Sequence, residues 1–88
     1  MLEKDPNEVK DYALDWGARR LAASETISSS TWIAPEGITV DSDTDTTTTT
    51  TVWLSGGTAG VHYTLTNRVV TSQGRTYDWS ITVLVAEQ

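Results

Sequence analysis

The chain has 88 residues, a net charge of −6 and no cysteine. Its length allows one small domain, and the lack of cysteine excludes disulfides, thiolate nucleophiles and thiolate metal ligands. The acidic balance argues against nucleic acid as a partner, because nucleic-acid-binding domains usually carry a basic face.

The composition favours an all-β fold. Serine and threonine together supply 24 residues, and four tryptophans and three tyrosines provide large apolar side chains for a core. β-Branched and aromatic side chains suit a pleated, half-buried surface. The opening stretch MLEKDPNEVKDY lacks the apolar centre of a signal peptide, and no apolar run approaches the roughly 20 residues of a membrane span. We therefore expect neither an export signal nor a membrane partner.

The N-terminal segment allows two interpretations over residues 5–20. The stretch DPNE at 5–8 matches a helix start, with an acid at the N-cap and proline at the first helical position. The apolar residues that follow also alternate as they would in a strand, at Tyr12, Leu14 and Trp16. Both interpretations remain open from the sequence.

Of these two interpretations, we favour an extended arm over residues 1–10 and then a strand through Trp16. The arm is polar, contains proline and lies outside the alternating pattern. The folded domain would then span 11–88, and removing residues 1–9 would leave it intact while weakening assembly on a partner.

The middle of the chain contains three further strand candidates. Glu25–Ile33 is one, ended by a Pro-Glu-Gly turn, and Ile38–Val40 is a short second one. An exposed acidic turn is expected at 41–46. The threonine run that begins at Thr46 leads into a third strand, Thr48–Leu54, because threonine is a good strand former. The alternative is a flexible loop through Thr51.

The C-terminal part predicts a β-hairpin. Apolar and polar residues alternate over 60–71, and again over 77–85, around the glycine-bearing turn SQGR at 72–75. The whole chain therefore holds six or seven short strands separated by turn signals, which is typical of a small β-sandwich.

Motifs for catalysis or metal binding are weak. DSDTD at 41–45 begins like a calcium loop, but Thr46 and Val52 occupy the places where an EF-hand needs glycine and glutamate. His62 alternates with core positions, so it is expected to face solvent, and no nucleophile elbow surrounds any serine. A glycosidase-like carboxylate pair would need a cleft larger than so small a sandwich offers. We expect no enzyme activity, no cofactor and no metal.

The tryptophans divide into two groups. Trp16, Trp32 and Trp79 lie within alternating runs and are expected in the core. Trp53 adjoins Leu54, so one of the two must point outward, and an exposed Trp53 could anchor an interface. Stacking of a tryptophan on sugar, as in a carbohydrate-binding module, is the alternative.

The sequence resembles small proteins encoded among the structural genes of tailed bacteriophages. The similarity spans about residues 4–86 and is carried by KDP, a D-W pair, SSTW before a proline turn, WLSGGTAG, and YTLTNR followed by TSQGRT. The stretch from Gly60 to the C-terminal SITV is also similar to the last strands of bacterial immunoglobulin-like modules.

This resemblance implies an immunoglobulin-like virion component, and the residues themselves add the extended N-terminal arm. We interpret the chain as a capsid decoration (cement) protein that binds the major capsid protein in a homo-oligomeric arrangement, assembled in the host cytoplasm. The alternative is a tail, connector or fibre module that binds host-surface glycan or other virion proteins. The residues expected at the protein interface are Met1, Leu2, Lys4, Pro6, Val9, Arg19, Arg20 and Trp53.

Overall fold

Alternating apolar and polar residues give the chain an almost entirely extended backbone. The computed structural model describes residues 2–87, which form seven strands and one short helix. These elements are β1 (Leu2–Lys4), β2 (Lys10–Asp15), α1 (Trp16–Arg19), β3 (Ile27–Ile33), β4 (Ile38–Asp45), β5 (Thr49–Gly56), β6 (His62–Thr71) and β7 (Thr76–Val85). None of the helical structure in this range is long or apolar enough to cross a membrane.

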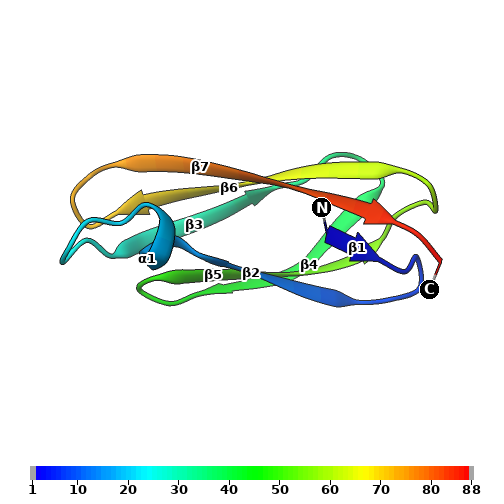
Figure 1. Ribbon diagram of the computed structural model, residues 1–88, viewed down its shortest axis with the longest axis horizontal. Helices are drawn as coiled ribbons and strands as arrows, with labels where there is room; N and C mark the ends of the chain where they lie inside the picture. Colours follow the sequence, from blue (N-terminus) through cyan, green and yellow to red (C-terminus); the bar gives the residue numbers. More distant parts are fainter. Residues whose placement is uncertain (1, 88) are drawn as a thin grey trace.

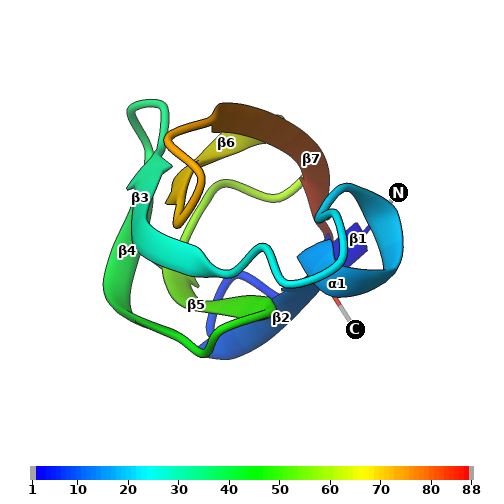
Figure 2. The ribbon, with the colours of Figure 1, turned by 90° about the vertical axis from the view of Figure 1, so that its left-hand side faces the viewer.

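The strands form two sheets that pack face to face (Figures 1 and 2). One sheet has the order β1-β7-β6-β3 and the other has the order β2-β5-β4. Only β1 pairs in parallel, with β7, and the other neighbours pair antiparallel. This arrangement confirms the predicted all-β class and the small β-sandwich.

The core lies between the sheets and consists of the inward residues of every strand. One cluster fills the end near β1, and the second surrounds Trp16 at the other end, with Trp32 and Ile81 packed against both. The side chains of the two clusters are Tyr12, Ile38, Val52, Leu54, Tyr63, Leu65, Val83 and Val85 in the first, and Leu14, Trp16, Ile27 and Val69 in the second.

The predicted C-terminal hairpin is confirmed, with β6 and β7 in continuous antiparallel register. One expected apolar position is polar: Asn67, on the inner face of β6, is fully buried. Its Oδ1 accepts hydrogen bonds from the Trp16 indole N–H (2.9 Å) and the Thr50 hydroxyl (2.7 Å). Its Nδ2 donates to the Ser30 hydroxyl and to the Thr31 carbonyl. Asn67 therefore joins β6 to the opposite sheet and to β3.

The second half of the threonine run forms a strand, as predicted, rather than a loop through Thr51, although β5 begins at Thr49 and not at Thr48. The prediction of an acidic turn at 41–46 is wrong, because residues up to Asp45 pair with β5 as part of β4. The turn consists instead of threonines, where the Thr46 hydroxyl accepts hydrogen bonds from the backbone N–H groups of Thr48 and Thr49. An edge strand tolerates exposed acids because one of its sides faces solvent.

The N-terminal segment takes parts of both earlier interpretations. A strand covers Lys10–Asp15, and Trp16 then begins the short helix α1, whose N-cap Asp15 accepts a hydrogen bond from the Ala18 N–H. The DPNE stretch is a turn rather than a helix start, since the Asp5 carboxylate accepts from the Asn7 N–H.

Part of the segment that we expected to extend as an arm lies in the sandwich. Leu2–Lys4 pairs with β7 as β1, and the Tyr12 hydroxyl of the other sheet donates to the Glu3 carbonyl at 2.6 Å. Lys4 is fully buried, and its ammonium donates to the Gly56 and Asp5 carbonyls, both at 2.8 Å. β1 is thus held by both sheets. It pairs with β7 in its own sheet, and the Lys4 ammonium and the Tyr12 hydroxyl bond it to the β2-β5-β4 sheet.

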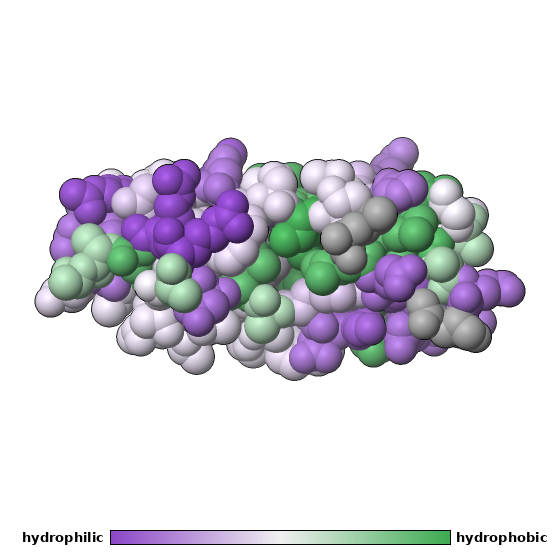
Figure 3. All heavy atoms as spheres, viewed as in Figure 1, coloured by the Kyte–Doolittle hydropathy of each residue, from purple (hydrophilic) through white to green (hydrophobic). Residues whose placement is uncertain are grey.

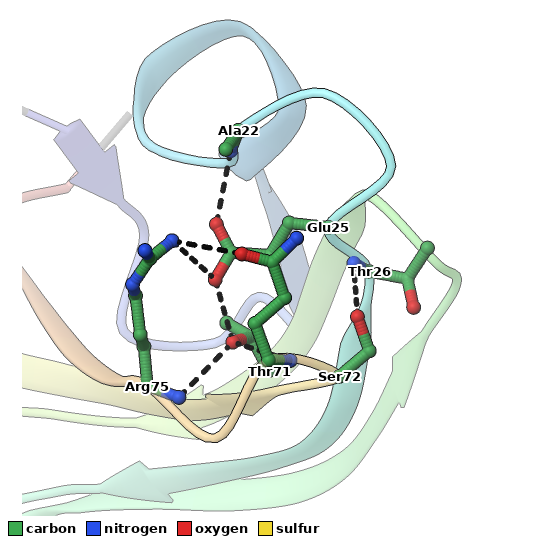
Figure 4. Close-up of polar contacts among 7 residues, drawn as sticks. Ala22, Glu25, Thr26, Thr71, Ser72 and Arg75 are labelled. Carbon is green, nitrogen blue, oxygen red and sulfur yellow. Dashed lines mark hydrogen bonds and ion pairs between the residues drawn. The ribbon is translucent and has the colours of Figure 1, made fainter.

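A buried carboxylate ties the loop after α1 to the β6–β7 turn (Figure 4). Glu25 accepts hydrogen bonds from the Thr71 hydroxyl (2.7 Å) and the Ala22 N–H (2.9 Å), and Arg75 lies 3.4 Å away. The hydrogen bond from Thr71 is the largest cause that lowers the pKa of Glu25, followed by that from Ala22. The carboxylate is thus held ionised in a buried position.

Candidate protein-binding groove

The two sheets leave an opening on one side, between β2 and β7. β2 is an edge strand of its sheet, and β7 is ten residues long. The three-residue β1 covers β7 only from Val83 to Val85. Within the part of the chain that the structure describes, the rest of β7 therefore pairs only with β6. In Figure 2, β1 and α1 lie on this side of the sandwich, next to β2 and β7.

A groove of about 490 Å³ occupies the opening, so our expectation that so small a sandwich has no room for a cleft of this size is wrong. Figure 3 looks onto this side of the molecule and shows apolar surface in the middle of the face. Apolar side chains from both sheets form most of the lining, and Asp11 and Thr82 add polar atoms. The lining residues are Leu2, Asp11, Tyr12, Ala13, Leu14, Trp79, Ile81 and Thr82.

Two arginines stand beside the groove at the end near α1. The Arg19 guanidinium lies 4.1 Å from the centroid of the Trp79 ring, and that of Arg20 lies 5.1 Å from the Tyr77 ring. Trp16, fully buried, supports both rings by stacking on Tyr77 and meeting Trp79 edge-on. The helix α1 directly follows β2, so it places both arginines across the gap from β7.

The arginines are the distinctive charges of this site. Within residues 2–87 neither one forms an ion pair, whereas Arg68 and Arg75 pair with Asp78 and Glu25. At the groove wall, burial is the main cause that raises the pKa of Tyr12 to about 12, and nearby Glu8 and Asp11 raise it further. The phenol therefore stays neutral at physiological pH.

The residues that we predicted at an interface occupy several places. Leu2 lines the groove, and the two arginines stand at one end of it. Arg19 lies in α1 and Arg20 is its C-cap, although we expected a loop after Trp16 rather than a helix. Lys4 is fully buried, so its side chain is not available to a partner. Pro6 is half-buried in a turn, while Val9 is 61% exposed. Met1 lies outside the described residues.

Trp53 lies on a different surface, the outer face of the β2-β5-β4 sheet. Leu54 is fully buried, so Trp53 is the member of the pair that points outward, and it is half-buried. It pairs with Asp11 on β2 and Ser42 on β4. The structure thus does not bring Trp53 together with the arginines.

Sequence analysis did not identify the groove itself. Trp79 and Ile81 were assigned to the core because they alternate with polar residues, and they do face inward. Their inner side is only partly covered, because β1 stops short of them. Alternation shows which face a residue is on, but it does not show which strand will lack a neighbour.

Metal chemistry has no obvious site in this part of the molecule. Residues 2–87 contain no group of three or more histidine, aspartate or glutamate side chains placed to hold a metal ion. His62, the single histidine, is exposed on β6. The arrangement offers apolar surface, strand edges and two cations, which are features that bind protein segments.

Comparison with known proteins gives one family. A search of curated proteins finds no match. Residues 4–84 match the family model of the podophage GP4 fiber-tail adaptor protein gp77. This match supports the expectation of a phage virion structural protein, and it fits a tail or fibre location better than the capsid decoration that we expected. The chain belongs to the podophage GP4 fiber-tail adaptor protein gp77 family.

Proposed function

We propose that this protein is a non-enzymatic adaptor that helps to attach a fibre to the tail of a podophage particle. The family match over residues 4–84 carries this proposal. The small sandwich is suited to such a role, since it presents an apolar groove, two arginines and an outward tryptophan to other virion proteins. Its partners would be the tail and the fibre, and its location would be the virion.

A phage mutant tests this role against capsid decoration. The codon for Tyr12 is replaced by a stop codon in a phage that encodes the protein, and particles are grown with and without a complementing copy. We expect DNA-filled heads on tails that lack fibres, with a large loss of infectivity that the copy restores. Negative-stain electron microscopy counts the fibres on each particle.

The same particles provide the opposing result. Heads that leak DNA on heating or dilution, on particles that keep their fibres, would overturn the adaptor proposal and favour the decoration role. Wild-type fibre number together with stable heads would overturn both roles.

A further inference from the structure

Among residues 2–87, no strand pairs with β7 on its groove side before Val83. The N–H of Thr71 donates to the Arg75 carbonyl, and the N–H of Val85 donates to the Val61 carbonyl. Odd-numbered residues at both ends of β7 thus bond toward β6, and the register between these ends is continuous. Because backbone groups alternate along a strand, the even-numbered Asp78 and Ser80 point their N–H and C=O groups to the open side.

The open side already accepts one extended segment. The N–H of Ala86 donates to the Lys4 carbonyl at 2.8 Å, so an even-numbered position after β7 bonds to β1. β1 begins opposite Val83. An extended segment of another protein that continued the line of β1 along β7 would lie beside Asp78–Thr82, which is about five residues or roughly 17 Å of strand.

The two edge strands on the far side of the sandwich are protected, whereas the two strands beside the groove are not. β3 and β4 form the opposite edges, and each has a register irregularity. β4 also carries three exposed aspartates. Bulges and charges of this kind are the usual means by which edge strands avoid pairing with other chains. β7 and β2 pair regularly, with no shift in register.

We infer that the groove between β2 and β7 binds an extended segment of a tail or fibre protein, which adds as a strand along Asp78–Thr82. This inference rests on the proposed adaptor function and names the surface that would carry it. Alternate side chains of the guest would fill the groove over Leu14, Trp79 and Ile81. Main-chain hydrogen bonds supply affinity in strand addition, and side-chain pockets supply specificity.

Charge defines the guest further. Arg19 and Arg20 form no ion pair within the described chain and stand at one end of the groove. On a protein of net charge −6 they form a local cationic site. The guest should therefore carry apolar side chains at alternate positions and an acidic residue at the end near α1.

An unfolded or flexible segment fits this site better than a second copy of the chain. The apolar side chains of β7 already pack inside its own sandwich. Pairing two β7 edges would satisfy the backbone but would leave both grooves unfilled. A segment that is extended and unpaired before binding provides side chains that can enter the groove.

Two variants at one position separate backbone from side-chain effects. Ser80→Pro removes the outward N–H, whereas Ser80→Ala keeps it and removes only the hydroxyl that bonds Thr66. Binding to the purified fibre and, separately, to the purified tail of the same phage is measured by biolayer interferometry. We expect Ser80→Pro to weaken one of these interactions at least tenfold and Ser80→Ala to change it less than threefold. Arg19→Gln with Arg20→Gln should weaken the same interaction and reduce its salt dependence.

Hydrogen exchange on the wild-type protein provides a second measurement that needs no folded variant. The amides of Asp78 and Ser80 should exchange fast in the free protein and at least tenfold more slowly once the partner is bound. The amide of Ser42 on β4 serves as the control and should not change.

The outcomes distinguish this inference from the proposed function. Tight binding of tail or fibre with no protection at Asp78 and Ser80 would overturn the groove inference and leave the adaptor role standing. Protection that develops in the protein alone at high concentration would overturn it in favour of self-association. If the wild-type protein binds neither the tail nor the fibre, the adaptor role is overturned, and the inference with it.

Discussion

Asn67 interrupts an otherwise apolar face, and its side-chain bonds explain the exception. Its amide uses both hydrogens, and its oxygen accepts two hydrogen bonds, from Trp16 and Thr50. The Trp16 indole also donates to Thr50 at 3.2 Å. Buried polar networks of this kind specify one arrangement of a core, because any partly satisfied arrangement costs desolvation energy.

Replacing Asn67 by leucine should destabilise the protein strongly although leucine is apolar. The change leaves the Thr50 hydroxyl hydrogen without its acceptor and the Trp16 N–H with only its 3.2 Å bond to Thr50. We expect the free energy of unfolding to fall by about 2–4 kcal/mol. Urea denaturation measures the loss. Thr66→Val on the outer face removes only a hydroxyl pair with Ser80 and should cost about 0.5 kcal/mol. Equal losses for the two variants would contradict the role of the network.

Glu25 makes the stability of the folded protein depend on pH. Its pKa in the folded protein lies below the ordinary value of 4.5 because Thr71 and Ala22 donate hydrogen bonds to the carboxylate. A lowered pKa contributes stability above the unfolded value, and this contribution is lost as pH falls through the folded pKa. The melting temperature should therefore decline below about pH 5.

The Glu25→Gln variant should show a shallower decline in melting temperature over that acidic range than the wild type. Thermal unfolding from neutral pH to about pH 3 gives this comparison. Asp78→Asn is the matched control, because Arg68 also lowers the pKa of Asp78 but at an exposed site. Parallel curves for Glu25→Gln and the wild type would show that Glu25 does not carry the effect.

At the scale of elements, β1 is the segment for which the structure changes the expectation most. Its residues pair with β7, its Lys4 is fully buried, and its Glu3 carbonyl receives the Tyr12 hydroxyl. The sequence LEKDP at residues 2–6 contains three charged residues and a proline, which suggests a solvated arm. A lysine is nevertheless tolerated in the interior when its stem packs and its ammonium meets carbonyl oxygens.

Removing residues 1–9 should therefore lower stability rather than leave it unchanged. The deletion exposes the edge of β7 over Val83–Val85 and removes the hydrogen bonds of Lys4 and Glu3. We expect a loss of at least about 2 kcal/mol, or roughly 8–16 °C in melting temperature for a domain of this size. Differential scanning calorimetry measures it. An unchanged melting temperature would restore the description of this segment as a dispensable arm.

At the scale of the whole molecule, the two long sides of the sandwich differ. The side with β3 and β4 has irregular registers and acidic residues, and the side with β2 and β7 has regular registers and carries the mainly apolar groove. On β4, Asp43 and Asp45 pair with Val52 and Thr50, which are buried on the inner face, although the aspartates themselves are exposed. Charges in such positions discourage another strand from pairing at that edge.

Replacing Asp43 and Asp45 by valine should promote self-association through β4. Valine suits a strand and removes the repulsion, so the variant should form dimers or larger species that analytical ultracentrifugation detects as a rise in sedimentation coefficient with concentration. The matched control is Glu36→Val with Glu87→Val, which removes the same two charges at exposed sites outside the strands. If both double variants associate equally, net charge rather than edge protection is responsible.

The C-terminal half could be predicted well from the sequence, and the reason is local. Alternation over 60–85 with a glycine-bearing turn determines both strands and their inward faces, because neighbouring side chains in a strand point to opposite sides. For Trp53 and Leu54 the same rule states only that one of them points outward, and the structure shows that it is Trp53. The prediction of an acidic turn at 41–46 failed because a charged edge strand resembles a turn in composition.

The sequence by itself determined the β class, the hairpin, the inward residues and the phage structural family that residues 4–84 confirm. Only the tertiary structure decided that β1 stops at Lys4 beside a long β7, that Lys4 is buried, and that Arg19 and Arg20 lie over aromatic rings at the groove. Periodicity is a property of neighbouring residues, whereas a strand edge without a partner depends on how distant segments pair. The groove results from that long-range pairing, so no local sequence pattern predicts it.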